Sequence, residues 1–186
     1  MIECFEKYKT AFLNSKGEEA IKYIDSKSVD YYKDILDKIL YADKEEVMKE
    51  SYINRFMIFR VRHSMQLKNL KEMDVTRLLV FAIDHGWIEK DAAIGMSVKN
   101  VKINGNMATA DYYQDNKKTG IRFQFFYENE QWKYNYTSVV QFSSSLSKQQ
   151  IKEFGYSDED EFIFDMIWGE SGKKVSKDIY ESLIKK

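Results

Sequence analysis

Five side chains in this sequence of 186 residues could carry general acid–base chemistry: His63, Asp84, Asp111, Tyr113 and Tyr134. Such chemistry needs a carboxylate or an imidazole in an apolar pocket, where desolvation raises a carboxyl pKa, and a hydrogen-bond donor that faces it. Asp111, Tyr113 and Tyr134 lie on predicted strands, and the other two lie on predicted helices that precede them. Their spacing does not bring them together by itself. On the alternative interpretation, Asp111 lies on a solvated strand face and the tyrosines cover the sheet.

Metal and nucleophilic chemistry have little support in the sequence. His63 and His85 are the only histidines, and neither has a partner at the i+3 or i+4 spacing of metal sites on helices. Cys4, the single cysteine, could act as a nucleophile only if a histidine from elsewhere in the fold activated it, and an incidental thiol is far commoner. We therefore predict no metal site and no cofactor, and we assign no catalytic residue.

The charge balance limits the classes of partner. The chain has 29 basic and 30 acidic residues, a formal net charge of -1, so no net field draws it to nucleic acid or to an anionic membrane. Basic residues do gather in the predicted central helices, but acidic residues interleave with them, which favours a solvated helical face. These basic residues are Arg60, Arg62, Lys68, Lys71 and Arg77. We predict no nucleic-acid partner and no membrane partner.

The first residues include an acid and no basic-then-apolar stretch, so the sequence as given carries no secretory signal. The expected location is the cytoplasm, or an extracytoplasmic compartment if a signal peptide was removed. The single cysteine fits either location, because it cannot form an internal disulfide.

Helices are predicted over residues 2–41 and, as a helical insertion, over residues 43–86. In both ranges apolar residues recur at three- and four-residue steps, which is typical of one buried stripe on a helix. The second range opens with Asp43-Lys44-Glu45-Glu46, which has the spacing of a capping box and predicts the start of a long helix. Gly86 is placed to end the last helix of this range.

From Met96 onward the hydrophobic period changes from about 3.6 to 2, which predicts an antiparallel meander over residues 96–142. Asn104-Gly105 suits a tight hairpin turn, residues 115–120 are expected to form a second loop, and residues 128–131 a third. Aromatic residues alternate with polar ones on the later strands, so one face of this sheet needs a cover of helices.

Further helices are predicted over residues 147–185. Ser147–Gln150 has the spacing of a capping box, a helix is expected from about Asp158, and a last helix is expected to present Ile179 and Ile184. No linker or repeat divides the chain. We therefore predict a single α+β domain over residues 1–186, in which N-terminal helices pack on an antiparallel sheet of about four to five strands.

Three stretches of the predicted sheet, with the helices before it, carry a family resemblance. The stretches read VKNVKINGNMATA at 98–110, FQFFYE at 123–128 and QWKY at 131–134, and the helical residues lie at 8–17 and 20–24. Together they resemble the nuclear transport factor 2-like superfamily, in particular its bacterial members, which often show a valine-rich strand, a Gly-Asn turn, an aromatic strand and a Trp-Lys pair. The resemblance implies a curved sheet wrapped around helices as a cone, often with a pocket at its wide mouth, and frequently a homodimer formed through the sheet.

A small apolar ligand would fit such a pocket. The residues that we assign to its lining are His63, Asp84, Asp111, Tyr113, Phe123, Phe125, Trp132 and Tyr134. Members of the superfamily include polyketide cyclases, ketosteroid isomerases and dehydratases, and also transport and assembly modules that catalyse nothing, so the fold does not decide the function.

The favoured interpretation is a non-enzymatic binding or interaction module. The alternative is a small-molecule isomerase, cyclase or dehydratase that uses a pocket carboxylate as its general base. On a third interpretation, the additional helices dock a partner.

Overall fold

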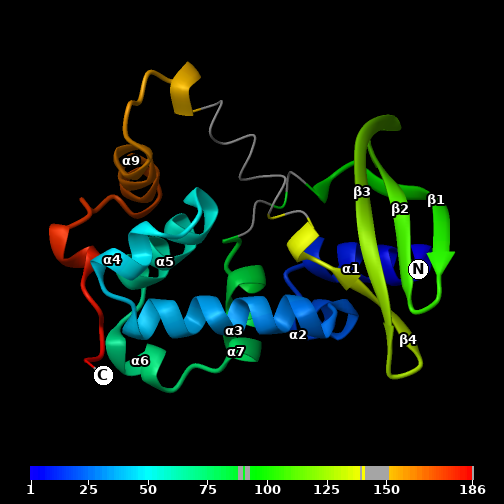
Figure 1. The fold of residues 1–186 in the computed structure, drawn as a ribbon, viewed down its shortest axis with the longest axis horizontal. Coiled ribbons are helices and arrows are strands. Elements are labelled where there is room, and N and C mark those ends of the chain that lie inside the picture. The colour runs from blue at the N-terminus through cyan, green and yellow to red at the C-terminus, as the bar shows by residue number, and fades with distance from the viewer. Residues whose placement is uncertain (88–89, 91–92, 139, 141–150, 186) are drawn as a thin grey trace. The chain divides into compact units, whose positions relative to one another are not determined.

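A four-stranded antiparallel sheet follows the N-terminal and central helices along the chain and precedes the C-terminal ones; its strands are green to yellow-green in Figure 1. The computed structural model describes residues 1–87, 90, 93–138, 140 and 151–185. The helices are α1 (Ile2–Leu13), α2 (Gly17–Ala20), η1 (Ile21–Tyr23), α3 (Ser26–Tyr41), α4 (Lys44–Met48), α5 (Tyr52–Ser64), α6 (Leu67–Lys71), α7 (Val75–Asp84), α9 (Glu159–Ser171) and η3 (Lys177–Tyr180), where η denotes a 3-10 helix. The strands are β1 (Met96–Asn104), β2 (Met107–Gln114), β3 (Lys117–Glu128) and β4 (Gln131–Asn135). The predicted α+β class with N-terminal helices is confirmed.

The chain divides into two compact units. The sheet unit comprises Met1–Tyr32 and Val75–Val139, and the helical unit comprises Lys33–Asp74 and Val140–Lys186. Helix α3 contributes its first turns to the sheet unit and its later turns to the helical unit. This division does not test whether either unit folds alone, so the assignment of a single domain to residues 1–186 stays a prediction.

Tight turns connect the strands in the order β1-β2-β3-β4. Gly105, with φ 57°, lies in the predicted first hairpin, and Asn129–Glu130, with φ 50° and 63°, forms the third turn. The second turn is Asp115–Asn116, with φ 49° and 64°. The prediction of a loop over residues 115–120 is wrong, because Asp and Asn tolerate the left-handed conformation of a two-residue turn and β3 begins at Lys117.

Helix α1 covers one face of the sheet with aromatic side chains. The ring centroid of Phe5 lies 5.5 Å from that of Phe123 and 5.4 Å from that of Tyr134. The ring of Tyr134 also lies 5.2 Å from Tyr8 and 5.6 Å from Phe125. All five rings are buried. The aromatic residues that alternate along β3 therefore face the leading helices, which cover them as the sequence period predicts.

The residues before α3 run along the edge of β4. Ile24 forms a parallel bridge with Tyr134, and the N–H of Asp25 donates to the carbonyl oxygen of Tyr134 at 3.0 Å. The buried carboxylate of Asp25 accepts the N–H of Ser28 at 3.0 Å and the side-chain amide of Asn135 at 2.7 Å. Asp25 thus caps the start of α3 and ties that start to the sheet.

In the helical unit, the capping box at Asp43 is confirmed, but the long helix predicted from it is wrong. The Asp43 carboxylate accepts the N–H of Glu46, and the Glu46 carboxylate accepts the N–H of Asp43, yet α4 has only 5 residues. A second cap follows, because Ser51 Oγ accepts the N–H of Asn54 and α5 begins there. Residues 67–84 are also divided, into α6 and α7, and Gly86 with φ 65° ends α7 as predicted.

The guanidinium of Arg62 binds backbone carbonyl oxygens from two segments. It donates to Lys38, Ile39 and Ala42, at the end of α3, with distances of 2.9, 2.9 and 2.7 Å. It also donates to Ile179 at 2.9 Å. Burial lowers the pKa of Arg62 to about 10, so the group stays protonated at neutral pH. The prediction that Arg62 lies on a solvated helical face is therefore wrong, since the side chain is buried.

Charged and aromatic contacts join α9 to α5. Arg55 Nε lies 2.8 Å from Asp160 Oδ1, and Arg55 Nη2 lies 2.5 Å from Glu159 Oε2. Tyr180 Oη donates to Asp160 Oδ2 at 2.8 Å, and its ring lies edge-on to Phe59 at 5.1 Å. The buried Asp160 thus has partners on both sides, as a buried carboxylate requires.

The C-terminal predictions have three different outcomes. The helix expected from Asp158 is confirmed as α9, whose first turn this residue caps. The prediction of a last helix that presents Ile179 and Ile184 is wrong, because among the described residues only the short η3 forms there. The capping box predicted at Ser147–Gln150 lies outside the described residues.

Candidate functional site

The structure divides the predicted pocket residues between the two faces of the sheet. Phe123, Phe125 and Tyr134 point towards α1 and are 1%, 0% and 2% exposed. Trp132 lies on the same face, partly buried against the core, with its ring 5.3 Å from that of Tyr127. These four residues therefore pack against α1, against neighbouring strands and against one another.

Asp111 and Tyr113 lie on the opposite face, which we call the outer face. In the register of β2 and β3, Ala110 pairs with Phe123 and Asp111 pairs with Arg122. Because successive side chains of a strand point to opposite faces, the Asp111 carboxylate is directed away from Phe123. The carboxylate and the aromatic rings that were expected to line one pocket are not brought together.

His63 and Asp84 belong to neither of these groups of sheet residues. His63, at the end of α5 in the helical unit, places Nε2 3.0 Å from Ser171 Oγ on an exposed surface. Asp84, at the end of α7 in the sheet unit, accepts the N–H of Gly17 at 2.7 Å. Each side chain has a local structural partner.

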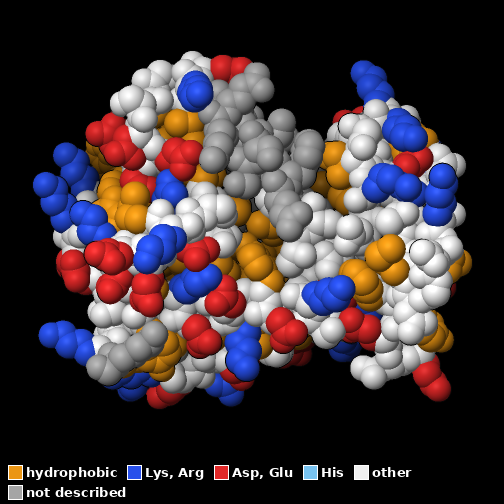
Figure 2. Space-filling model, in the orientation of Figure 1, with side chains coloured by type: hydrophobic (Ala, Val, Ile, Leu, Met, Phe, Trp, Pro, Cys, Tyr) orange, Lys and Arg blue, Asp and Glu red, His pale blue; other side chains and the backbone are white. Residues whose placement is uncertain are grey.

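The outer face carries an excess of positive charge. Its basic residues are Lys99, Lys102, Lys118, Arg122 and Lys133 from the strands, with Lys27 from the first turn of α3. Its acidic residues are Asp111 and Glu128. Figure 2 shows Lys and Arg side chains gathered over β1 to β3. The side chains of Lys118 and Arg122 are 53% and 39% exposed, so this charge is accessible to solvent.

Three donors hold the carboxylate of Asp111 at the centre of the outer face. Lys118 Nζ lies 2.8 Å and Asn100 Nδ2 3.0 Å from Oδ2, while Arg122 Nε lies 3.3 Å from Oδ1. The hydrogen bond from Lys118 lowers the pKa of Asp111, and Asn100 and Arg122 lower it further. Asp111 is therefore an ionised carboxylate that binds two cations, and its low pKa makes it a weak base.

A β-bulge in β1 brings Asn100 to this carboxylate. The pairing of β1 with β2 shifts between Lys99 and Lys102, and Asn100 has φ 54°, a left-handed conformation that Asn tolerates. The same amide donates to Tyr113 Oη at 3.3 Å. The bulge thus re-aims one polar side chain from the strand edge onto the outer face.

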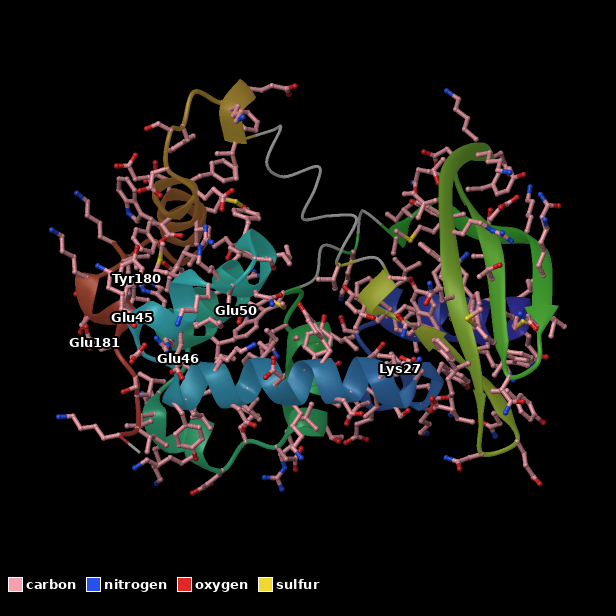
Figure 3. The ribbon with its side chains drawn as sticks, in the orientation of Figure 1. Lys27, Glu45, Glu46, Glu50, Tyr180 and Glu181 are labelled. Carbon is pink, nitrogen blue, oxygen red and sulfur yellow. The ribbon has the colours of Figure 1, made fainter. Side chains whose placement is uncertain are left out.

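Ammonium groups cover the two aromatic rings of the outer face. Lys99 Nζ lies 4.8 Å from the ring centroid of Tyr113, and Lys27 Nζ lies 3.9 Å from that of Phe126. Lys27 is labelled in Figure 3, at the start of α3. Glu128, beside this ring, accepts the N–H and the hydroxyl of Ser26 at 3.0 and 2.8 Å. Glu128 is therefore committed to the start of α3.

Sequence reasoning missed Lys99, Lys118 and Arg122 as members of this site. One signal could have found them, because the alternation that buries Phe123 requires Arg122 to point the other way. The positions of Asn100 and Lys118 had no such signal, since each depends on a bulge whose location the period does not reveal.

The helical unit has an acidic groove of about 480 Å³ between α3 and α4. Four carboxylates and two lysines line it: Asp34, Asp37, Glu46 and Glu50, with Lys38 and Lys49. Glu46 and Glu50 are labelled in Figure 3. Most of its carboxylates have structural partners: Asp34 and Glu50 lie 2.5 and 2.8 Å from Lys38 Nζ, and Glu46 completes the α4 capping box. We therefore interpret the groove as a structural feature.

Comparisons with known proteins identify no relative of this chain. No family model matches the chain, and neither a curated protein nor a solved structure matches it. Within the described ranges, no group of three or more His, Cys, Asp or Glu side chains is arranged to hold a metal ion. No helix in the described part of the chain has the length and apolar character needed to cross a membrane.

Proposed function

We propose that this chain is a non-enzymatic interaction module with a nuclear transport factor 2-like core, and that the outer face of its sheet receives the partner. One observation carries the proposal: six basic and two acidic side chains share an accessible sheet face. An antiparallel sheet commonly leaves one polar face to solvent, but the excess of basic over acidic side chains on this face would also steer and orient a partner of opposite charge.

The burial of the aromatic face supports an interaction surface over an internal pocket. In a cone that binds a small apolar ligand, Phe123, Phe125 and Tyr134 would line free volume. Here these side chains are close-packed with α1 and are at most 2% exposed. A ligand pocket at this position would require α1 to move away from the sheet.

The state of Asp111 gives less support to the alternative, an isomerase, cyclase or dehydratase. A carboxylate general base acts best when burial in an apolar pocket raises its pKa. Lys118, Asn100 and Arg122 have the opposite effect on Asp111. Turnover of a small ketone or polyketide analogue that is lost in Asp111→Asn and kept in Lys118→Gln would favour the enzyme instead.

The family resemblance implies a homodimer formed through the sheet. Such a dimer would place the outer face of one chain against the same face of its partner. Like charges would then meet across the two-fold axis and repel. We therefore expect this face to bind a different molecule. A dimer that forms at low salt and that is weakened by the charge reversal Lys118→Glu/Arg122→Glu would contradict this expectation.

Site-specific photo-crosslinking tests the proposed function. Gln124 is exposed on the outer face, and Lys68 is exposed in the helical unit. A benzoylphenylalanine at position 124 therefore samples the outer face, and one at position 68 samples a surface of the helical unit. In an extract of the source cells, we expect the full chain to form one discrete adduct from position 124 and none from position 68. Adding Lys118→Glu/Arg122→Glu to the position-124 variant should abolish the adduct. Equal labelling at both positions, or no adduct, would overturn the proposal.

A further inference from the structure

The outer face also indicates the chemistry of its partner. Resting on the proposed function, we infer that this face binds an acidic polypeptide segment through its side-chain carboxylates. Charge complementarity carries the inference. The sheet unit as a whole contains 13 Lys and Arg and 13 Asp and Glu residues, yet its outer face gathers six of the first kind and two of the second.

Asp111 demonstrates how the face binds a carboxylate. Two cations and an amide converge on its oxygens within 3.3 Å. Lys118 has three N–H donors and uses one of them for Asp111, and Arg122 contacts Asp111 through Nε, so its Nη groups are the further donors of the same guanidinium. Asp111 thus occupies part of the donor capacity of two partly exposed cations, and their remaining N–H groups are the donors for a second carboxylate from outside.

The rings of the outer face favour a peptide over a nucleic acid. Sheets that bind single-stranded nucleic acid stack bases on open aromatic faces. Here Lys99 covers Tyr113 and Lys27 covers Phe126. Asp111 and Glu128 would also repel a continuous phosphate backbone, whereas a peptide with spaced Glu residues can avoid them.

A direct binding assay on the full chain tests the inference. The probe is a short fluorescein-labelled peptide of alternating Glu and Ser, followed by fluorescence anisotropy; the comparison probes are the same peptide with Lys for Glu and an oligothymidylate of equal charge. We expect saturable binding of the Glu peptide alone. Binding should weaken between about 50 mM and 200 mM salt, because charge pairs on a surface are screened.

Two variants and a matched control make the assay specific to the outer face. Lys118→Glu/Arg122→Glu should reduce the affinity for the Glu peptide by about tenfold or more, since it reverses the two central cations. Lys33→Glu/Lys68→Glu makes the same change in net charge in the helical unit, where both lysines are exposed, and should alter the affinity by less than about twofold. Asp111→Asn removes the competing carboxylate and should raise the affinity by a few-fold.

The expected increase in the affinity of Asp111→Asn for the Glu peptide keeps the test informative even if a charge-reversal variant is unstable, because damage to the fold cannot improve binding. The melting curve of each variant checks its fold. Equal effects of the two charge reversals would overturn the inference. Tighter binding of the oligothymidylate would overturn it in favour of a nucleic acid. If the Glu peptide does not bind while position 124 still forms its crosslinked adduct, the acidic-peptide inference falls and the interaction module stands.

Discussion

Gly17 of α2 lies directly against Val80 of α7: a Cβ on Gly17 would lie 2.7 Å from the carbonyl oxygen and 2.8 Å from the Cα of Val80. The two helices meet through their backbones, and the N–H of Gly17 donates to the carboxylate of Asp84. The contact leaves no room for a side chain.

Replacement of Gly17 by Ala should therefore destabilise the protein. We expect Gly17→Ala to lower the free energy of unfolding by about 1–3 kcal/mol, because the new methyl group meets backbone atoms that cannot turn aside. Gly169→Ala is the matched control: Gly169 lies in α9 with nothing within 4 Å of its Cβ position, so Ala there should stabilise by about 0.5–1 kcal/mol. Urea unfolding followed by circular dichroism measures both, and a neutral Gly17→Ala would contradict the close contact.

Arg62 should be essential to the stability of the helical unit. Arg62→Met leaves buried carbonyl oxygens of α3 and of Ile179 without donors, and we expect a loss of about 3 kcal/mol or more in the free energy of unfolding. Arg62→Lys keeps the charge but replaces the planar fork by a single ammonium, and it should recover only part of this loss. Both values come from urea unfolding curves. A loss below about 1 kcal/mol in Arg62→Met would show that water replaces the guanidinium.

Asp111 should titrate below the ordinary range of an aspartate. Its pKa is lowered in the folded state, so its contribution to stability is present above the unfolded pKa of about 3.9 and is lost as the pH falls through the folded pKa. The stability of wild type relative to Asp111→Asn should accordingly decline below about pH 4. A carbon-detected NMR titration of the Asp111 carboxyl group in wild type and in Lys118→Gln checks the cause. The pKa should rise when the Lys118 ammonium is removed.

Cys4 should react slowly in the native protein. The thiol is buried in the aromatic core of the sheet unit, and burial raises its pKa. A disulfide reagent such as DTNB should label it roughly a hundredfold more slowly than in urea, because the folded chain must first open locally. Labelling at equal rates in both conditions would place Cys4 at an open surface. The result also tests the nucleophile considered from the sequence, since a reactive thiolate would label at once.

Much of the architecture could be predicted because local signals agree with the final fold. The apolar stripe of α1, the hairpin at Gly105 and the capping box at Asp43 each depend on residues within a few positions, and all three form. The change of period at Met96 marks the start of β1. These signals are strong because turn geometry and helix caps act on adjacent residues.

The candidate site could not be predicted in the same way, because it depends on register. A shift of one residue moves every side chain of a strand to the other face. The sequence places Asp111 and Phe123 on neighbouring strands, but only the pairing of Ala110 with Phe123 shows that they face opposite ways.

The predicted length of the helix from Asp43 and the predicted solvation of Arg62 were wrong because each depends on features that the hydrophobic period does not report. The second cap at Ser51 divides a stretch whose apolar period runs through it. Arg62, among other basic residues, is typical of a solvated face, yet distant carbonyl oxygens satisfy its donors. Sequence neighbours do not reveal such partners.

The bulge at Asn100 has a consequence for the behaviour of the molecule in concentrated solution. Strand β1 is at one end of the sheet, and an edge strand offers its backbone N–H and C=O groups as a template on which other chains can add and aggregate. Here a left-handed residue interrupts the template, and Lys99 and Lys102 flank it with charge. The distortion that directs an amide to Asp111 thereby also discourages fibril-like growth from this edge.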